Sequence, residues 1–392
     1  MATQVGDIRA EMTDRSNPAA SALGYVSRNL LTILGLIVLA WLIWRGVSTI
    51  AAGEYTLETF VRQLIFGLAQ GSIYALIALG YTLVYGILRM INFAHSEVFM
   101  AGTYIGFFFI DAMDHSGFLA ENTAISLLIV FAAAIAASVL VAVGLERIAY
   151  RPLRNAPRLI PLITAIGAST FLQRAFQGLF GSSPRVYPDV HFYVFPQIFN
   201  TLECGVAEGV EVCRGLDLIS GRYNVNVFGV ELVFRPIYFL VFITAIIMMV
   251  ALTQFVKRTK TGKAMRAVSE DKATAALMGI NVDRVIVTTF VLGAALAGVA
   301  GVLFALYNSQ VTPTMGFVPG IKAFTAAVLG GIGNISGAAV GGLFLGTVES
   351  VSPSLLDIPS QLKDVIAFGV LVLVLILRPS GIMGEVLTEK KA

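Results

Sequence analysis

The chain has 392 residues, of which 57% are hydrophobic and only 13% are charged. Its mean hydropathy is +0.82, whereas soluble domains carry roughly 25% charged residues. A soluble fold of this length needs more polar surface than the sequence contains, so the composition excludes an ordinary soluble protein. The net charge of +3 requires no nucleic acid, because basic residues gathered on one side of a membrane account for it.

Long uncharged runs dominate the chain: 63–88, 122–145, 236–256, 285–321 and 323–348. Each reaches or exceeds the roughly 20 residues that cross a bilayer as a helix. They predict an all-α, polytopic integral membrane protein with about ten spans. The expected spans are 30–50, 62–88, 90–110, 123–145, 159–180, 235–256, 285–308, 320–332, 334–351 and 364–378. The first ends in Trp41–Leu42–Ile43–Trp44, which is no cleavage site, so an uncleaved span is favoured over a signal peptide.

The basic residues orient these spans. With the N-terminus in the cytoplasm, 18 of the 27 Lys and Arg residues fall in cytoplasmic segments, as the positive-inside rule requires. We therefore expect both termini inside. We expect a cytoplasmic tail and first span in 1–60, a transmembrane domain in 61–382 and a cytoplasmic tail in 383–392. The transmembrane domain contains an external loop, 181–234, and a cytoplasmic loop, 257–284.

Polar residues interrupt the expected third span. Asn92, His95 and Ser96 fall at i, i+3 and i+4 on one face of a helix expected to begin just after Arg89. Glu97 is the clearest acid within a span, and an ionisable group at that depth is a functional-site hypothesis. In the alternative interpretation the segment lies near the inner headgroups, and Glu97 snorkels to them or pairs with Arg89. The four residues are candidates for a polar path through the membrane.

The external loop contains the only two cysteines, Cys204 and Cys213. In an oxidising compartment such a pair closes a short hairpin, which limits the unfolded loop. The alternative is two unpaired thiols in a mobile loop. Either role is structural.

The cytoplasmic loop carries a short polar stretch with helix signals. Ser269 is an acceptable N-cap, and Glu270 and Asp271 occupy a favourable first turn. Alanines follow, and Gly279 is a good C′ residue. So short a helix is marginal in water unless it docks on something. A docking helix and a solvated basic loop are both consistent with this pattern.

A glycine-rich stretch joins the eighth and ninth spans, and its residues are Gly330, Gly331, Gly333 and Asn334. Glycines between apolar halves predict a broken helix or a re-entrant pair whose free backbone groups line a cavity. Close helix packing is the alternative, since Gly337 and the following glycines have GxxxG spacing. The two interpretations can coexist.

Four stretches are distinctive in combination: "LGYTLVYGILRMINFAHSEVFMAGTYIGF" (79–107), "ERIAYRPLRNAPRLIPLITAIGASTFLQ" (146–173), "RAVSEDKATAALMGINVDRVIVTTFVLGAALAGVAGVLFAL" (266–306) and "KAFTAAVLGGIGNISGAAVGGLFLG" (322–346). Together they resemble the branched-chain amino acid permeases of ABC importers. They follow the family's order, are distributed over most of 60–382, and are most similar to the H-type subunit. The first 60 residues and the external loop look expanded, which affects how an external binding protein would dock.

The resemblance implies an ABC importer permease fold in the bacterial inner membrane. It implies a non-catalytic subunit that binds no cofactor, metal or nucleic acid. The resemblance also implies that this subunit pairs with a second permease in the lipid, receives substrate from a periplasmic binding protein, and couples to two cytoplasmic ATPases that use ATP and Mg²⁺. Glu270, Asp271, Ala276 and Gly279 match the family's coupling motif. The predicted ATPase-coupling residues are Ser269, Glu270, Asp271, Ala276, Leu277, Met278 and Gly279.

Other functions remain alternatives at this point. Similar permeases move urea or short amides, and uptake assays distinguish them. An ion-driven carrier needs several buried carboxylates, whereas Glu97 and His95 are the ionisable candidates within the spans. A receptor or scaffold would bind no ATPase. No Cys/His cluster, Walker A motif or nucleophile elbow occurs in the sequence, so no pattern indicates a hydrolytic enzyme.

Overall fold

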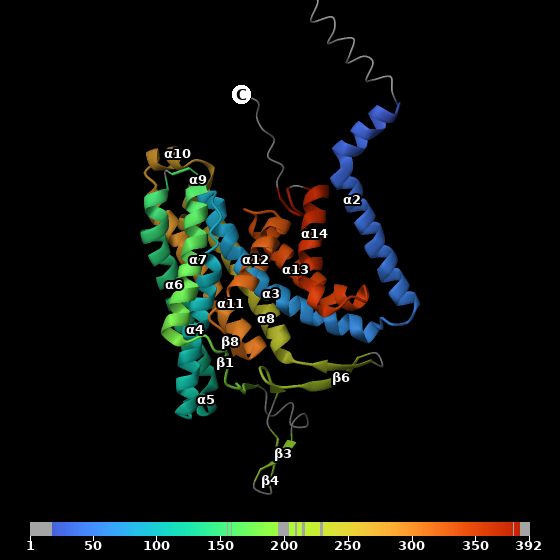
Figure 1. Cartoon of the computed structure of the whole chain (residues 1–392). Coiled ribbons are helices and arrows are strands. Elements are labelled where there is room, and N and C mark those ends of the chain that lie inside the picture. The colour runs from blue at the N-terminus through green and yellow to red at the C-terminus, as the bar shows by residue number, and fades with distance from the viewer. Residues whose placement is uncertain are drawn as a thin grey trace, which may run out of the picture. The chain divides into compact units, whose positions relative to one another are not determined.

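The computed structural model describes residues 18–154, 156–157, 159–194, 204–207, 210–213, 216–227, 230–378 and 380–384. Most of both predicted tails lies outside these ranges. Helices dominate (Figure 1): α2 (Pro18–Ala51), α3 (Leu57–Leu88), α4 (His95–His115), α5 (Phe118–Glu121), α6 (Thr123–Leu145), η1 (Glu146–Tyr150), η2 (Arg151–Leu153), α7 (Leu159–Phe180), α8 (Pro236–Arg258), α9 (Lys260–Glu270), α10 (Lys272–Leu277), α11 (Val282–Asn308), α12 (Phe317–Gly330), α13 (Ile335–Leu355), η3 (Ser360–Leu362) and α14 (Lys363–Leu377).

The helices form two compact units, and the organisation expected from the sequence stays a prediction. The smaller unit combines described residues 18–56 with 352–378, and the larger combines 57–351 with 380–384. In the smaller unit α2 packs against α14. An ion pair there joins Arg45 Nη2 to Asp357 Oδ2 at 2.6 Å, and Arg45 Nε donates to the Leu356 carbonyl.

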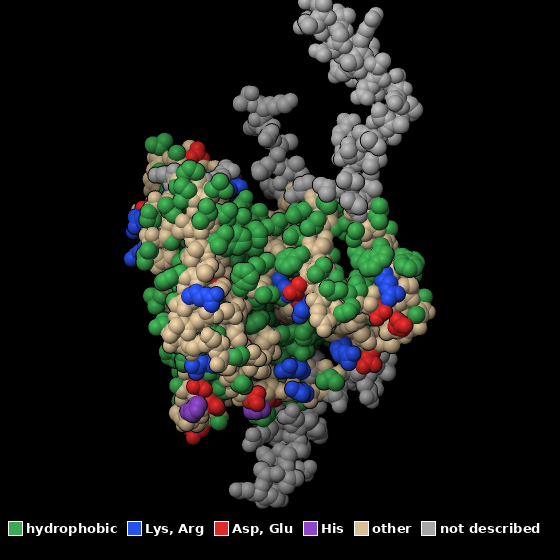
Figure 2. Space-filling view, in the orientation of Figure 1, with side chains coloured by type: hydrophobic (Ala, Val, Ile, Leu, Met, Phe, Trp, Pro, Cys, Tyr) green, Lys and Arg blue, Asp and Glu red, His purple; other side chains and the backbone are tan. Residues whose placement is uncertain are grey.

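The larger unit is built around α11, which packs against α3, α4 and α6. Most of α3 and α11 is buried, whereas α6, α7 and α8 leave large apolar side chains such as Leu140, Ile163 and Ile247 exposed. Hydrophobic side chains are spread over the visible helical surface (Figure 2). Helices with buried cores and apolar outer faces are what a bilayer requires.

Seven helices in the described part of the chain are long and apolar enough to cross a membrane. They lie at Leu57–Leu88, Thr123–Leu153, Leu159–Phe180, Pro236–Arg258, Val282–Asn308, Ile335–Leu355 and Ser360–Leu377. Shorter apolar helices occupy Gly35–Ala51 and Phe317–Gly330. The chain is therefore an integral membrane protein, and a total of about ten crossings stays a prediction.

The structure corrects the expected third span. Arg89 has a φ of 57°, which ends α3, and the helix that follows begins at His95. Asn92 therefore precedes α4 and does not share a helical face with His95. A left-handed residue interrupts the helical backbone, and no apolar pattern in this stretch signals it.

The region expected to be an external loop adds short strands to the all-α fold. They are β1 (Arg185–Val186), β2 (Tyr193–Val194), β3 (Cys204–Ala207), β4 (Val210–Cys213), β5 (Leu216–Asp217), β6 (Tyr223–Val227) and β7 (Val230–Phe234), with β8 (Gln310–Val311) after α11. Antiparallel pairs form between β1 and β8, β2 and β5, β3 and β4, and β6 and β7. The first pair lies at the opposite end of the larger unit from α9 and α10 (Figure 1).

The cysteines occupy facing positions in one of these hairpins. Cys204 of β3 is the register partner of Cys213 of β4. This backbone register is compatible with a disulfide, which stays a prediction.

Candidate functional site

The predicted coupling segment forms two short helices rather than one. Ser269 and Glu270 close α9, so the prediction that Ser269 caps a helix is wrong. Asp271 is the N-cap of α10, and its Oδ1 accepts hydrogen bonds from the N–H groups of Ala273 at 2.7 Å and Thr274 at 3.1 Å. These N–H groups, with the Thr274 hydroxyl, lower the pKa of Asp271. The carboxylate binds two otherwise unpaired donors, which explains why the helix starts here.

Gly279 ends α10 as the sequence predicts. Its φ is 82°, a conformation that favours glycine. Its N–H donates to the Ala276 carbonyl at 3.0 Å, and the Ile280 N–H donates to the Ala275 carbonyl at 3.1 Å, which is the Schellman arrangement. The adjacent apolar residues Leu277 and Met278 are 87% and 78% exposed. α10 is thus a capped helix with a bare apolar tip.

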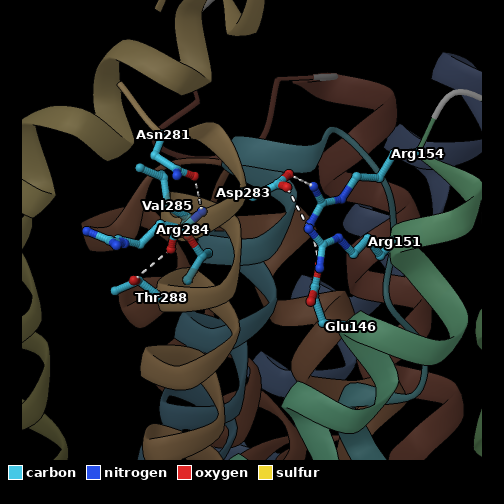
Figure 3. A network of polar contacts seen from close by, with 9 residues as sticks. Glu146, Arg151, Arg154, Asn281, Asp283, Arg284, Val285 and Thr288 are labelled. Atoms are coloured by element: carbon cyan, nitrogen blue, oxygen red, sulfur yellow. Dashed lines mark hydrogen bonds and ion pairs between the residues drawn. The ribbon is translucent and has the colours of Figure 1, made fainter. Parts of the chain in front are cut away.

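An arginine-centred network anchors the start of α11 beside α10 (Figure 3). Asp283 accepts from Arg151 at 2.8 Å and forms a second ion pair with Arg154. Arg154 also pairs with Glu146, whose side chain is fully buried at the end of α6. The first turn of α11 is therefore tied to the segment that follows α6.

Further contacts hold the same region. The Asn281 side chain caps α11 by accepting from the Arg284 N–H at 2.9 Å. The Arg89 guanidinium lies 3.4 Å from the Ser269 carbonyl, which links the end of α3 to α9. Burial lowers the pKa of Lys272, and the nearby charges of Arg154 and Arg89 lower it further. Lys272, at the start of α10, therefore lies within electrostatic reach of both arginines.

Glu97, one of the four path candidates, is buried completely on α4. Its Oε1 accepts from Ser96 Oγ at 3.2 Å, Ser169 Oγ at 3.1 Å and Gln173 Nε2 at 2.8 Å. The partners of Glu97 on α7 are neutral. The alternative interpretation, in which Glu97 pairs with Arg89, is not observed. Ser169 and Gln173 escaped prediction, although their i, i+4 spacing places them on one helical face.

The other path candidates near α4 are also held by specific contacts. Asn92 Oδ1 accepts from the Tyr150 hydroxyl at 2.5 Å. The His95 ring is buried and fills the space beside Gly80, where a Cβ would collide with Nε2. The Tyr81 ring lies edge-on to it, with centroids 5.0 Å apart. These contacts fix their positions within the larger unit, and a role in transport stays a prediction.

The glycine-rich stretch breaks between α12 and α13, as predicted. Gly331 and Gly333 take φ values of 104° and 99°. The carbonyls of Leu329 and Gly330 accept from the N–H groups of Ile382 and Met383 at 2.8 and 3.0 Å, and Asn334 Nδ2 donates to the Met383 carbonyl at 2.9 Å. These backbone groups therefore bind the segment 380–384 instead of opening into a cavity.

Close packing, the alternative interpretation of these glycines, is observed. A Cβ on Gly330 would collide with the Gly337 carbonyl. The same helix α13 meets α3 through a second glycine contact, where a Cβ on Gly71 would stand 2.7 Å from the Gly342 carbonyl oxygen. The backbones of α3, α12 and α13 approach one another closely, as small residues permit in membrane proteins.

Sequence reasoning missed a second ionisable site within the helices. Lys322 of α12 and Glu349 of α13 form an ion pair with Nζ 2.6 Å from Oε1, and their side chains are 4% and 1% exposed. The expectation that Glu97 and His95 are the ionisable candidates within the spans is therefore wrong. A signal was present, because Lys322 separates two long uncharged runs and Glu349 ends the second.

The fold and these sites define a polytopic membrane protein with buried polar groups between helices and a projecting helix at one end. Residues 63–375 match the family described as the branched-chain amino acid transport system permease component, and the chain belongs to this family. The resemblance predicted from the four stretches is confirmed. Members of this class are transport permease subunits and not enzymes.

Curated relatives span most of the chain. The high-affinity branched-chain amino acid transport system permease protein BraD of Pseudomonas aeruginosa is 44% identical over 331 residues, which cover 84% of this chain and 98% of the relative. The corresponding LivH proteins of Salmonella typhimurium and Escherichia coli K12 are 43% and 42% identical over 84% of this chain and 97% of each relative. No solved structure matches the chain.

Proposed function

We propose that this chain is the transmembrane permease subunit of an ATP-driven importer for leucine, isoleucine and valine in the bacterial inner membrane. It pairs with a second permease subunit and takes substrate from a periplasmic binding protein. Two cytoplasmic ATPase subunits bind and hydrolyse ATP with Mg²⁺, and this chain binds neither. Family membership and the names of relatives that span 84% of the chain support this function.

The structure of α10 is the observation that supports ATP coupling. The helix is capped by Asp271 at its start and by the turn at Gly279 at its end. Its exposed apolar tip offers a surface for a cytoplasmic ATPase. The chain then enters α11 within a few residues, where Asp283 is clamped by two arginines. A displacement of α10 is therefore transmitted directly to α11, the central helix of the larger unit.

Two measurements test this function: the uptake of labelled substrate and the subunit composition of the purified complex. The chain, expressed with its partner genes in a strain that lacks branched-chain amino acid uptake, should restore ATP-dependent accumulation of labelled leucine. Gentle solubilisation should recover it with a second permease and ATPase subunits. Restored uptake of urea without leucine would refute the substrate assignment. Uptake driven by an ion gradient without ATPase subunits would refute the transport mechanism.

The orientation is tested separately. With both termini in the cytoplasm, a cysteine placed at Thr274 should react with a membrane-impermeant thiol reagent only after the cells are opened, and a cysteine at Asp189 should react in intact cells. The reverse pattern would overturn the orientation while leaving the substrate assignment intact.

A further inference from the structure

The Lys322–Glu349 pair is unusual within the described part of the chain. Among the side chains described, Lys322 is the only lysine or arginine that is buried. The other fully buried acids of the helices differ from Glu349: the hydrogen-bond donors to Glu97 are neutral, and Glu146 pairs with the partly exposed Arg154. The pair is thus the one buried place, among these residues, where a cation and an anion meet.

Helix α3 completes the surroundings of the pair. The Tyr74 hydroxyl donates to Glu349 Oε2 at 3.1 Å, and Gln70 Nε2 donates to Glu349 Oε1 at 3.1 Å. Gln70 also donates to the Tyr74 hydroxyl at 2.6 Å, and Lys322 Nζ lies 5.8 Å from the centre of the Tyr74 ring. Both carboxylate oxygens are therefore bound, by groups from α3 and α12.

A buried ion pair adds little net stability to the packing of two helices. Removing two charges from water costs more than their attraction returns in many proteins, and apolar residues of similar size often stabilise as well or better. Within a membrane, such groups are found mainly where a substrate or ion passes. The pair therefore needs a reason beyond the packing of α12 against α13.

A free amino acid carries the same two charges as this pair. Its carboxylate can replace Glu349 as the partner of Lys322, and its ammonium can replace Lys322 as the partner of Glu349. The sum of charges stays zero, and no charge is left unpaired. A molecule with one charge, or none, leaves Lys322 or Glu349 without an oppositely charged group beside it in a medium of low dielectric constant, which is strongly unfavourable.

We propose that Lys322 and Glu349 form a charge-selective gate that binds the α-carboxylate and α-ammonium groups of the amino acid during its passage. This inference rests on the proposed function and names the site that recognises the zwitterion. The pair closes the path when empty, because the two charges satisfy each other. The turn that joins α12 to α13 contains two glycines with positive φ, and the lysine side chain is long, so the pair can separate without unfolding either helix.

The double substitution Lys322→Met with Glu349→Met separates a gate from a structural clamp. Apolar residues can replace a clamp, so a clamp predicts wild-type transport by the double variant. A gate predicts normal assembly with partner subunits but leucine uptake at least tenfold lower. Uptake should fall through Vmax and not through the apparent KM, because the binding protein sets the apparent KM. Normal uptake would overturn the gate, and so would failure of the double variant to assemble.

Two controls complete this test. Thr289→Val replaces another buried polar residue, whose hydroxyl donates within its own helix to the Val285 carbonyl at 2.8 Å, and should leave uptake unchanged. The wild-type complex is assayed in the same vesicles. Absence of leucine uptake by the wild type would refute the proposed function, whereas normal uptake by both the wild type and the double variant would refute the gate alone.

Direct labelling gives a second readout. Leucine that carries a photoreactive diazirine in its side chain is supplied to the intact complex during ATP hydrolysis and then irradiated. The gate predicts adducts in peptides from α3, α12 or α13 that contain or face the pair, and their loss in the double variant. Adducts found only in other helices would overturn the proposal.

Discussion

The contact between α3 and α13 permits a quantitative test with the substitution Gly71→Ala. The added Cβ would stand 2.7 Å from the Gly342 carbonyl oxygen and 2.9 Å from the Leu343 Cα. Ordinary contacts lie at about 3.5 Å or more, so the helices must separate by roughly 0.6–0.8 Å to relieve both. Both obstructing atoms belong to the backbone and cannot rotate away. Overpacking of this kind costs about 1–3 kcal/mol.

Gly86→Ala, on the same helix, is the matched control, because a Cβ there meets nothing within 4 Å. Replacing glycine by alanine favours a helix by up to about 1 kcal/mol at either position. That gain cancels in the comparison, so the two variants should differ by the overpacking alone. For a protein of this size, the difference corresponds to roughly 1–4 °C in melting temperature.

The assay is thermal unfolding of the two variants in the same detergent at one scan rate, since membrane proteins commonly unfold irreversibly. Gly71→Ala should melt below the wild type, and Gly86→Ala at or above it. Equal melting temperatures for the two variants would show that α3 and α13 do not pack backbone to backbone.

Other predictions concern the coupling region. Asp271→Ala should lower uptake per ATP hydrolysed, whereas Asp271→Asn keeps a capping oxygen and should preserve it; equal losses would contradict the capping role. Because hydrogen bonds from Thr274 and Ala273 hold the pKa of Asp271 below its ordinary 3.8, the stabilisation by its charge is full near neutral pH. That stabilisation disappears as pH falls through the lowered pKa, so amide exchange in α10 should speed up in acid, and less so in Asp271→Asn. Gly279→Val strains a residue at φ 82° by about 1–3 kcal/mol and should uncouple ATP hydrolysis from uptake without blocking membrane insertion, while Gly279→Asn is tolerated. Normal coupling in the valine variant would contradict the role of α10 in transmitting movement to α11. Arg154→Met leaves the buried Glu146 without its cation and should reduce the yield of folded protein, and Glu146→Gln in the same chain should restore it, as measured by the yield after size-exclusion chromatography.

Short sequence patterns predicted structural features correctly where neighbouring residues alone determine those features. After the first, the expected spans match the helices to within a few residues at each end, because length and apolarity decide whether a segment suits a bilayer. Gly279 and the break after Gly330 were predictable for the same reason, since only glycine takes these backbone angles without strain. Local rules misplaced the cap of α10, where Ser269 and Asp271 are both suitable residue types and the end of α9 decides between them.

The amino-acid sequence by itself determined the membrane environment, the approximate helices and the family, because these depend on contiguous residues and motifs. Only the tertiary structure decided which polar groups meet. Glu97 binds Ser169 and Gln173, Asp283 binds Arg154, and Lys322 binds Glu349 beside Tyr74. The partners in these sites come from separate helices, and charge or hydrogen-bonding capacity alone does not choose among the available partners. The choice is made by close packing of helix backbones, which brings particular side chains together away from water.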